Sequence, residues 1–330
     1  MALHRLSQVV IGVPNVEETA RYYSDFGLTG VRESTGEWGF RTLDGGEQLR
    51  LVPSPRRRLV ELTVGADDRD DLDRVNHQLT ALGVPVTRGA DRVSAVESAT
   101  GARAVVAIGA RLNQATVPAT PYNGPGRLER PNVRAPGVER ITPVRPRKLG
   151  HVVVGTTDVA STERFFLDGI GFKLSDRIAG AGAFMRCSTD HHNVLALAAP
   201  VSFLHHTSWQ VDDVDEVGRG AMTMLEDHPE RHVWGLGRHH AGSNFFWYLK
   251  DPAGNFSEYY SDMDSILDDQ LWTPEAHEGA KGLFNWGPPP PAMSPAAPRS
   301  RTRASTLPGS PAPRSPRVPG APWRPRWRGA

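Results

Sequence analysis

A chain of 330 residues is long enough to form two domains of ordinary size. Its 38 basic residues balance 37 acidic ones, so the composition favours neither nucleic acid nor a membrane surface as the main partner. The single cysteine, Cys187, excludes an internal disulfide and a cysteine-rich zinc site. Because no run reads as a signal peptide or as a membrane span, we expect a cytoplasmic protein.

Two segments, one in each half of the chain, share one pattern. Residues 7–28, SQVVIGVPNVEETARYYSDFGL, align with residues 150–172, GHVVVGTTDVASTERFFLDGIGF, at a constant offset of 143. Each copy predicts a short apolar strand, an Asn or Asp that caps a helix, and an amphipathic helix that ends near a glycine.

A second pair of segments repeats the same order. Residues 59–84 and residues 204–227 each predict a strand, an Asp cap and a helix. Four such beginnings, each followed by strand-like segments, predict an α+β fold of four βαβββ modules paired into two domains. We place the N-terminal domain at 1–135, a linker rich in Pro and Arg at 136–148, and the C-terminal domain at 149–288.

The segment FFWYLKDPAGNFSEYYSD, residues 245–262, predicts a hairpin around an Asp-Pro-Ala-Gly turn. Its second strand places Glu258 between two aromatic residues on one face. An unpaired buried carboxylate is costly, so Glu258 faces either water or a cation. The short turn also predicts that Tyr248 and Glu258 approach each other on neighbouring strands.

Residues 289–330 differ from the rest of the chain in composition. They contain no acidic residue and are dense in Pro, Ser and Arg. Such a segment cannot bury enough apolar surface to offset the entropy of ordering, so we expect it to be disordered. We interpret it as an incidental extension; a basic tail that contacts nucleic acid or a partner is the alternative.

The two halves share a scaffold but differ in polar residues, and the difference indicates where chemistry occurs. The second half carries His151, His206 and Glu258 at places where the first half has a glutamine, a glutamate and a valine. Two imidazoles and one carboxylate form the facial set that binds Fe(II) or a similar divalent ion and leaves open coordination positions. The same ligands would accept Mn(II), since metal availability often decides the choice.

These motifs resemble the vicinal oxygen chelate superfamily and, within it, the two-domain type I extradiol ring-cleavage dioxygenases that act on catechol or 2,3-dihydroxybiphenyl. The resemblance rests on LGHVVVGTTD, LHHTSWQVDDVDEVGR, LGRHHAGSNFFWY and DPAGNFSEYY in the second half; the first half matches in module pattern only. It covers roughly residues 1–290. It implies two glyoxalase-like domains, the first without metal, and insertion of both atoms of O2 into a catechol during aromatic catabolism. A homo-oligomer is also implied.

Neighbouring histidines leave two choices to make. His205 and His206 follow one another on a strand, so we expect their side chains on opposite faces and only one of them as a ligand. The alignment of GHVVV with HHTSW favours His206. The resemblance implies an acid–base histidine in HHNVLAL and favours His192, although His191 stays open.

The resemblance also assigns substrate contacts. It implies that Tyr248 hydrogen-bonds the substrate oxygen on the metal and that His239 lines the pocket. An acid–base imidazole at His192 would handle the proton of the second hydroxyl, because its ordinary pKa lies near neutrality.

Other classes of protein use the same fold. A non-catalytic module that binds an aromatic ligand would not need the ligand set, and a metal analysis distinguishes it. A glyoxalase-type lyase or isomerase would draw more carboxylates from paired modules. An iron dioxygenase acting on a 2-oxo acid uses a similar ligand triad, and O2 uptake with catechol but not with 4-hydroxyphenylpyruvate would separate it.

Overall fold

The structure is a computed structural model that describes residues 3–291. Nearly all of the segment predicted to be disordered, residues 289–330, lies outside the described residues, so that prediction stays untested. No helix among residues 3–291 is both long enough and apolar enough to cross a membrane.

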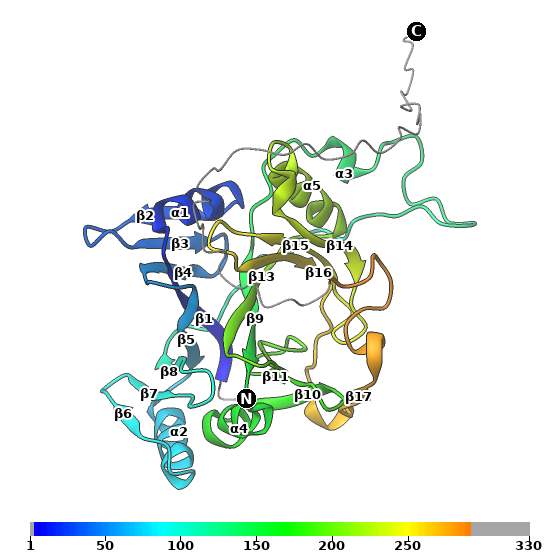
Figure 1. Cartoon of the computed structure of the whole chain (residues 1–330). Helices are drawn as coiled ribbons and strands as arrows, with labels where there is room; N and C mark the ends of the chain where they lie inside the picture. Colours follow the sequence, from blue (N-terminus) through cyan, green and yellow to red (C-terminus); the bar gives the residue numbers. More distant parts are fainter. Residues whose placement is uncertain (1–2, 292–330) are drawn as a thin grey trace, which may run out of the picture. The chain divides into compact units, whose positions relative to one another are not determined.

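The first half forms a mixed sheet of eight strands in the order β2-β3-β4-β1-β5-β8-β7-β6, with helices α1 and α2 packed on it (Figure 1). The helices are α1 (Val16–Asp25) and α2 (Arg69–Ala81). The strands are β1 (Leu3–Val13), β2 (Thr29–Arg32), β3 (Trp38–Thr42), β4 (Gly46–Pro53), β5 (Arg58–Ala66), β6 (Val86–Arg88), β7 (Arg92–Val96) and β8 (Arg103–Ile108).

The second half forms a sheet of nine strands in the order β14-β15-β16-β13-β9-β12-β11-β10-β17. Its helices are α4 (Val159–Arg164), which continues as a π-helical turn (Phe165–Ile170), and α5 (Val214–Leu225). The strands are β9 (Lys148–Thr156), β10 (Lys173–Ile178), β11 (Gly182–Arg186), β12 (Val194–Ala198), β13 (Phe203–Gln210), β14 (His232–Arg238), β15 (Phe245–Lys250), β16 (Phe256–Ser261) and β17 (Ala276–His277).

Both sheets are built from the predicted modules. The order is β1-α1-β2-β3-β4 and β5-α2-β6-β7-β8 in the first half, and β9-α4-β10-β11-β12 and β13-α5-β14-β15-β16 in the second. The opening strands of paired modules run antiparallel to each other, β1 beside β5 and β9 beside β13. The α+β fold of four βαβββ modules is therefore confirmed. The segment between the sheets contains one short helix, α3 (Pro136–Glu139), and the predicted domain limits remain a prediction.

Three of the four predicted helix caps occur. Asp68, Asp158 and Asp213 each accept a hydrogen bond at 2.9–3.1 Å from the backbone N–H three residues further on. Asn15 does not cap α1 with its side chain. Its Oδ1 instead accepts a hydrogen bond from the Thr19 hydroxyl at 3.2 Å, since that hydroxyl competes with the backbone for the same oxygen.

Strand β16 carries Glu258 on one face and packs against the first half of the chain through the other. The face opposite Glu258 carries Ser257, whose Oγ lies 2.5 Å from the hydroxyl of Tyr22 on α1. The ring of Tyr259 stacks on Phe26 with centroids 3.9 Å apart, and its hydroxyl donates to the Phe26 carbonyl at 2.7 Å. Ser257 and Tyr259 thus lie on the face opposite Glu258, as the alternation along the strand predicts. Through these two residues, β16 packs against the first half.

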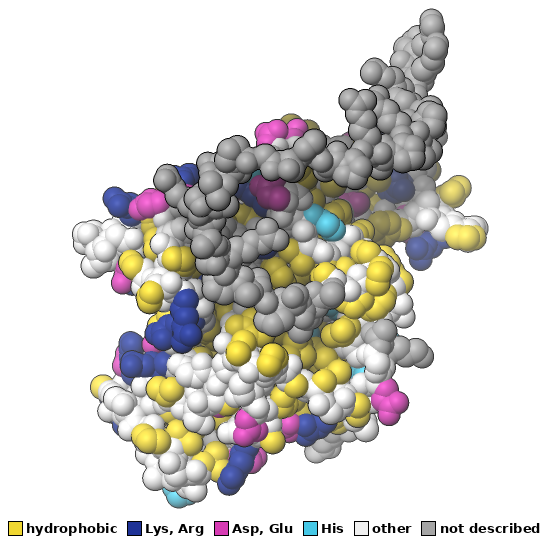
Figure 2. Space-filling view, in the orientation of Figure 1, with side chains coloured by type: hydrophobic (Ala, Val, Ile, Leu, Met, Phe, Trp, Pro, Cys, Tyr) yellow, Lys and Arg dark blue, Asp and Glu magenta, His cyan; other side chains and the backbone are white. Residues whose placement is uncertain are grey.

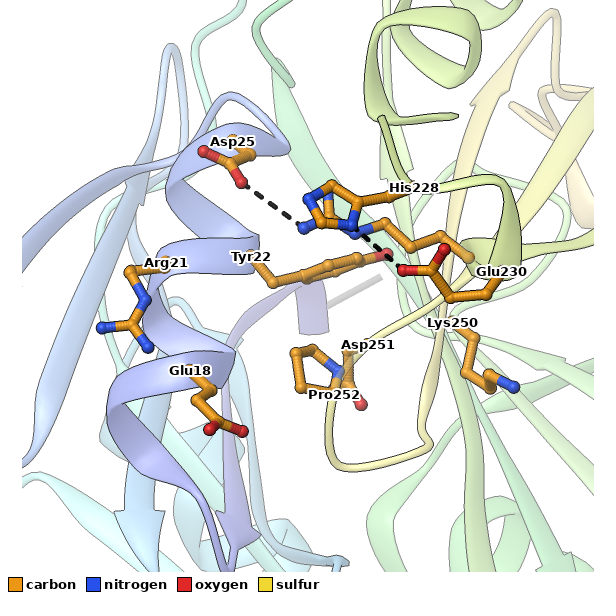
Figure 3. A pocket seen from close by; sticks show the side chains of 10 residues that line it. Glu18, Arg21, Tyr22, Asp25, His228, Glu230, Lys250, Asp251 and Pro252 are labelled. Carbon is orange, nitrogen blue, oxygen red and sulfur yellow. Dashed lines mark hydrogen bonds and ion pairs between the residues drawn. The ribbon is translucent and has the colours of Figure 1, made fainter. Parts of the chain in front are cut away.

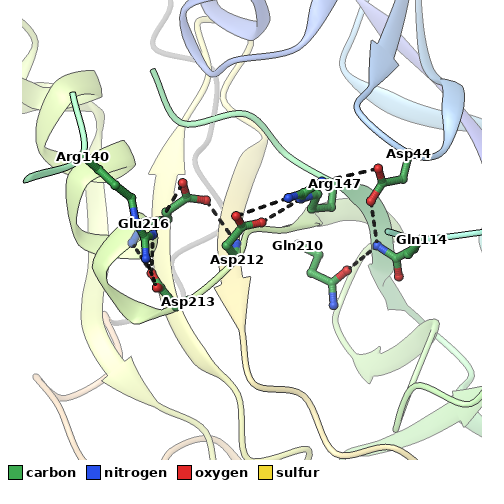
Figure 4. A network of polar contacts seen from close by, with 8 residues as sticks. All are labelled: Asp44, Gln114, Arg140, Arg147, Gln210, Asp212, Asp213 and Glu216. Atoms are coloured by element: carbon green, nitrogen blue, oxygen red, sulfur yellow. Dashed lines mark hydrogen bonds and ion pairs between the residues drawn. The ribbon is translucent and has the colours of Figure 1, made fainter. Parts of the chain in front are cut away.

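An ion-pair network also joins the two halves (Figure 4). Arg147 lies 2.7 Å from Asp212 of the second half and 3.5 Å from Asp44 of the first half. Gln114 donates hydrogen bonds from Nε2 to Asp44 at 3.2 Å and to Gln210 at 2.9 Å. Elsewhere on the surface, basic and acidic side chains lie interspersed on the face shown in Figure 2.

Candidate metal centre

The three predicted metal ligands meet on three adjacent strands. His151 lies on β9, His206 on β13 and Glu258 on β16, and β13 runs between the other two. Glu258 Oε2 lies 3.1 Å from His151 Nε2 and 3.3 Å from His206 Nε2, and the two Nε2 atoms are 3.3 Å apart. All three side chains are buried. The fold therefore brings together, in one small triangle, three atoms that can each ligate a metal ion.

This triangle has the size that an octahedral ion requires. Adjacent ligand atoms at bonds of about 2.1 Å lie about 3.0 Å apart in octahedral geometry, close to the observed 3.1–3.3 Å. Glu258 Oε2 has no hydrogen-bond partner among the described residues, although it is fully buried. A divalent cation held by all three ligand atoms would satisfy that oxygen and neutralise its charge.

Glu258 is ionised in this setting. Burial raises the pKa of Glu258, but the imidazoles of His151, His206 and His239 outweigh burial and hold it well below its ordinary value. Asn244 donates from Nδ2 to Glu258 Oε1 at 3.3 Å and orients the carboxylate. Sequence reasoning missed Asn244; its place in the GSNFFWY motif, directly before β15, was the available signal.

His206 faces His151 and Glu258 through Nε2, at 3.3 Å from each. Its choice over His205 as a metal ligand stays a prediction. The expectation that the two side chains separate to opposite faces is wrong, because their Nδ1 atoms lie 2.6 Å apart. A shift in strand register between Leu204 and His206 re-aims the side chains. Burial is the main cause that lowers the pKa of His205 to about 3 and that of His206 to about 4, so both rings are neutral at pH 7.

His192 and His191 occupy different positions relative to the ligands. The His192 ring lies beside the His151 ring, with centroids 4.2 Å apart. Burial, followed by His151 and His191, holds the pKa of His192 well below its ordinary value. The His191 ring has both nitrogens engaged, Nδ1 with His192 Nδ1 at 3.1 Å and Nε2 with Asp176 at 3.0 Å. His192 is thus the histidine adjacent to the ligands, and His191 lies behind it.

Tyr248 pairs directly with Glu258 across the β15–β16 hairpin, so their predicted approach is confirmed. Its hydroxyl lies 3.1 Å from His239 Nε2, and its ring lies 4.8 Å from that of His206. The ring of Trp234 stacks on that of Tyr248 with centroids 5.4 Å apart. Burial and the charge of Glu258 raise the pKa of Tyr248 well above its ordinary value, so it keeps its proton.

A separate pocket of about 580 Å³ lies between α1 and the turn that follows β15 (Figure 3). Its wall includes Glu18 and Asp25 from the first half and Glu230, Arg231 and Asp251 from the second. Arg231 pairs with Asp25 at 3.6 Å across it. The pocket contains none of the predicted site residues, and its charges of both signs do not suit an aromatic ring.

Comparisons with known proteins agree with this geometry. Residues 148–259, which include the three ligands, match the family described as the Glyoxalase/Bleomycin resistance protein/Dioxygenase superfamily. The chain is 31% identical over 302 residues to Metapyrocatechase 2 of Cupriavidus necator, across 87% of this chain and 90% of that protein.

Two further relatives carry a metal in their names. The chain is 26% identical over 330 residues to the manganese-dependent 2,3-dihydroxybiphenyl 1,2-dioxygenase of Geobacillus genomosp. 3, across 90% of this chain and 97% of that protein. The crystal structure of the Mn(II)-bound glyoxalase from Novosphingobium aromaticivorans has a TM-score of 0.71 at 25% identity. That match covers 90% of this chain and 95% of the other.

Proposed function

This chain belongs to the extradiol dioxygenases of the Glyoxalase/Bleomycin resistance protein/Dioxygenase superfamily, and we propose how its residues carry out ring cleavage. The enzyme inserts both atoms of O2 into a catecholic substrate and opens the ring beside the diol. It depends on a divalent metal ion, Fe(II) or Mn(II). The predicted family and reaction are thereby confirmed, whereas the roles of individual residues remain proposals.

His151, His206 and Glu258 are the proposed metal ligands, with Fe(II) as the proposed ion. The observation that carries this assignment is the triangle of their ligand atoms, 3.1–3.3 Å on a side and fully buried. When bound, the ion supplies coordination positions for the catechol oxygens and for O2 and a path for electron density from the ring to O2. These three residues would hold the ion and would leave its other coordination positions to substrate.

His192, Tyr248 and His239 are the proposed catalytic and substrate-binding residues. Neutral His192 accepts the proton of the substrate hydroxyl and later returns it to the product. Tyr248 keeps its own proton and donates a hydrogen bond to the substrate oxygen nearer to it. His239 Nε2 lies 3.1 Å from the Tyr248 hydroxyl and keeps the hydroxyl in place until substrate binds.

The proposal is tested by anaerobic reconstitution of the full-length chain with Fe(II), and in parallel with Mn(II). A panel of monocyclic and biphenyl-type catechols is then added with O2. We expect uptake of one O2 per catechol and a yellow ring-opened product, because the extended dienoate absorbs visible light. A glyoxalase-type reaction consumes no O2, so turnover of a thiol adduct without O2 uptake would contradict the proposal. Tight catechol binding without turnover would identify a binding protein instead.

Assembly, domain limits and location are further proposals. We propose a cytoplasmic homo-oligomer, with a metal-free domain at residues 1–135 and a metal-binding domain at 149–288. Apolar side chains on the segment between the two sheets support assembly: Ile141 is 94% exposed and Leu128 is 78% exposed. Light scattering of the purified chain tests the proposed assembly, and a monomer at micromolar concentration would contradict it.

A further inference from the structure

Three buried side chains, those of His192, His191 and Asp176, form a row of hydrogen-bond contacts. His192 Nδ1 lies 3.1 Å from His191 Nδ1, and His191 Nε2 lies 3.0 Å from Asp176 Oδ2. Asp176 lies on β10, 15 residues before His191, and is 4% exposed. Neither Asp176 nor His191 belongs to the proposed ligand set.

Asp176 is built to remain a carboxylate. Its Oδ2 also accepts a hydrogen bond from His277 Nε2 at 3.1 Å, and its Oδ1 accepts one from the backbone N–H of Glu275 at 2.8 Å. Burial raises the pKa of Asp176, but these hydrogen bonds and that of His191 outweigh burial and lower it. An ionised carboxylate accepts hydrogen bonds and donates none, so His191 Nε2 must carry the proton of the His191–Asp176 contact.

The position of that proton determines the tautomers of both histidines. A neutral His191 with its proton on Nε2 has a lone pair on Nδ1. The 3.1 Å contact between the Nδ1 atoms then requires that His192 donates from its Nδ1. The remaining nitrogen of His192, Nε2, therefore carries a lone pair, and no described residue hydrogen-bonds to it.

We infer that Asp176 and His191 are positioning residues that fix the tautomer and orientation of His192, so that its unprotonated Nε2 faces the substrate. The inference rests on the proposed function, in which His192 is the acid–base residue. In the proton transfer, the substrate O–H bond breaks and an N–H bond forms at His192 Nε2. The resulting imidazolium is stabilised through His191 by the negative charge of Asp176, in the manner of an Asp–His pair behind a nucleophile.

The surroundings hold this arrangement in place. The His191 side chain is fully buried, and its ring contacts the rings of Trp272 at 5.3 Å and Phe184 at 5.7 Å. Its backbone N–H donates to the Asp264 carbonyl at 2.9 Å, which anchors the loop. A fully buried ring in contact with two aromatic rings has little room to turn over.

Asp176→Asn exchanges donor and acceptor in each hydrogen bond from residue 176 to His192. The Asn carbonyl keeps the hydrogen bond from the Glu275 N–H, and its NH2 group then faces His191 Nε2 and donates to it. His191 must move its proton to Nδ1, so His192 becomes protonated on Nε2 and loses its basic nitrogen. We expect kcat with Fe(II) and catechol to fall about 10²-fold, within the range that a general base contributes. KM should change by less than about threefold, because the ligands are untouched.

A double-mutant cycle with His192→Phe separates positioning from a structural role. If Asp176 acts through His192, Asp176→Asn should change kcat by less than about twofold in the His192→Phe background. The same loss in both backgrounds would overturn the inference.

Asp190→Asn is the matched control. Asp190 is adjacent to His191 in the chain, but its carboxylate pairs with Lys148 at 2.7 Å and not with the His191 ring. Its kcat should stay within about twofold of wild type.

Tautomers are read directly by ¹H–¹⁵N NMR of the histidine rings in full-length protein loaded with diamagnetic Zn(II). We expect an Nδ1–H tautomer at His192 in the wild type and an Nε2–H tautomer in Asp176→Asn. An Nε2–H tautomer in the wild type, or a His191 protonated on both nitrogens, would overturn the inference even if the variant failed to fold. Absence of ring cleavage by the wild-type Fe(II) enzyme would instead refute the proposed function, while the NMR result would still test the tautomers.

Discussion

Glu258 is the residue at which burial and charge conflict most directly. It is fully buried yet ionised, and one of its oxygens has no hydrogen-bond partner among the described residues. His206 faces this oxygen through Nε2 and contacts His205 through Nδ1. A ligating imidazole is oriented by the partner of its other nitrogen, so His205 supports His206 without replacing it.

This division of roles predicts different outcomes for the two neighbouring histidines. His206→Ala removes a proposed ligand and leaves the charge of Glu258 less compensated, so metal affinity should fall by more than about 100-fold. His205→Ala removes the Nδ1 partner of His206 and none of the three proposed ligands, so metal affinity should fall by no more than about tenfold. Iron content after dialysis against a graded chelator measures both. Loss of iron in His205→Ala together with retention in His206→Ala would contradict the assignment.

At the scale of elements, the β15–β16 hairpin brings two functional side chains together. Pairing in register places Tyr248 opposite Glu258, while the reverse face of β16 packs against α1. At the tip of the hairpin, Asp251 is 3% exposed and accepts hydrogen bonds from the backbone and side-chain N–H groups of Asn255 at 2.8 and 3.0 Å. Burial is the dominant cause that raises the pKa of Asp251 to about 6.

Asp251 therefore makes stability depend on pH. As pH rises from about 4 to about 6, the unfolded chain releases this proton before the folded chain does, so the free energy of unfolding falls. The loss is complete above pH 6 and amounts to roughly 2–3 kcal/mol. Asp251→Asn should remove this slope and unfold at higher urea concentration at pH 7 than the wild type.

Urea titrations of wild type and variant from pH 4 to pH 7 give the difference directly. Asp262→Asn is the matched control, because Asp262 lies just after β16 and its side chain is 60% exposed in an ion pair with Arg238. That variant should keep the wild-type slope. An unchanged slope in Asp251→Asn would show that burial at this turn does not perturb the carboxyl group.

The repeat in the sequence was sufficient to predict the elements, because strand–cap–helix signals are local. It also placed His151, His206 and Glu258 on strands that become neighbours, since β13 pairs with β9 on one side and with β16 on the other. Their role as metal ligands stays a prediction. The register shift at His206 and the contact between Asp176 and His277, 101 residues apart, could not be predicted in this way. Both depend on how strands and loops settle against one another, and no spacing in the chain encodes that.

At the scale of the whole molecule, Arg147 links the two halves through charge. It contacts Asp212 and Asp44, and all three side chains are at most 21% exposed. Arg147→Met should lower the free energy of unfolding by roughly 2 kcal/mol, between the values typical of exposed and of buried pairs, because it leaves two partly buried carboxylates without their cation.

Urea unfolding at neutral pH measures this loss, with Arg145→Met as the control. The Arg145 guanidinium makes an exposed hydrogen bond to Thr29, so its replacement should cost less than about 0.5 kcal/mol. Equal effects of the two substitutions would show that the central ion pairs contribute no more than surface contacts do.

The stacking of Phe26 on Tyr259 has a consequence for how the duplicated halves can diverge. The first half has Gln8, Glu61 and Val105 at the places of the three proposed ligands, so we expect it to bind no metal. It still supports, through Phe26 and Tyr22, the back of the strand that holds Glu258. Selection on ring cleavage would therefore act on residues of the first half that do not contact substrate. In a mutational scan scored by activity, the face of α1 that packs on β16 should tolerate substitution nearly as poorly as the proposed ligands do. The first half would then be conserved for the support that it gives to β16, even without a reaction of its own.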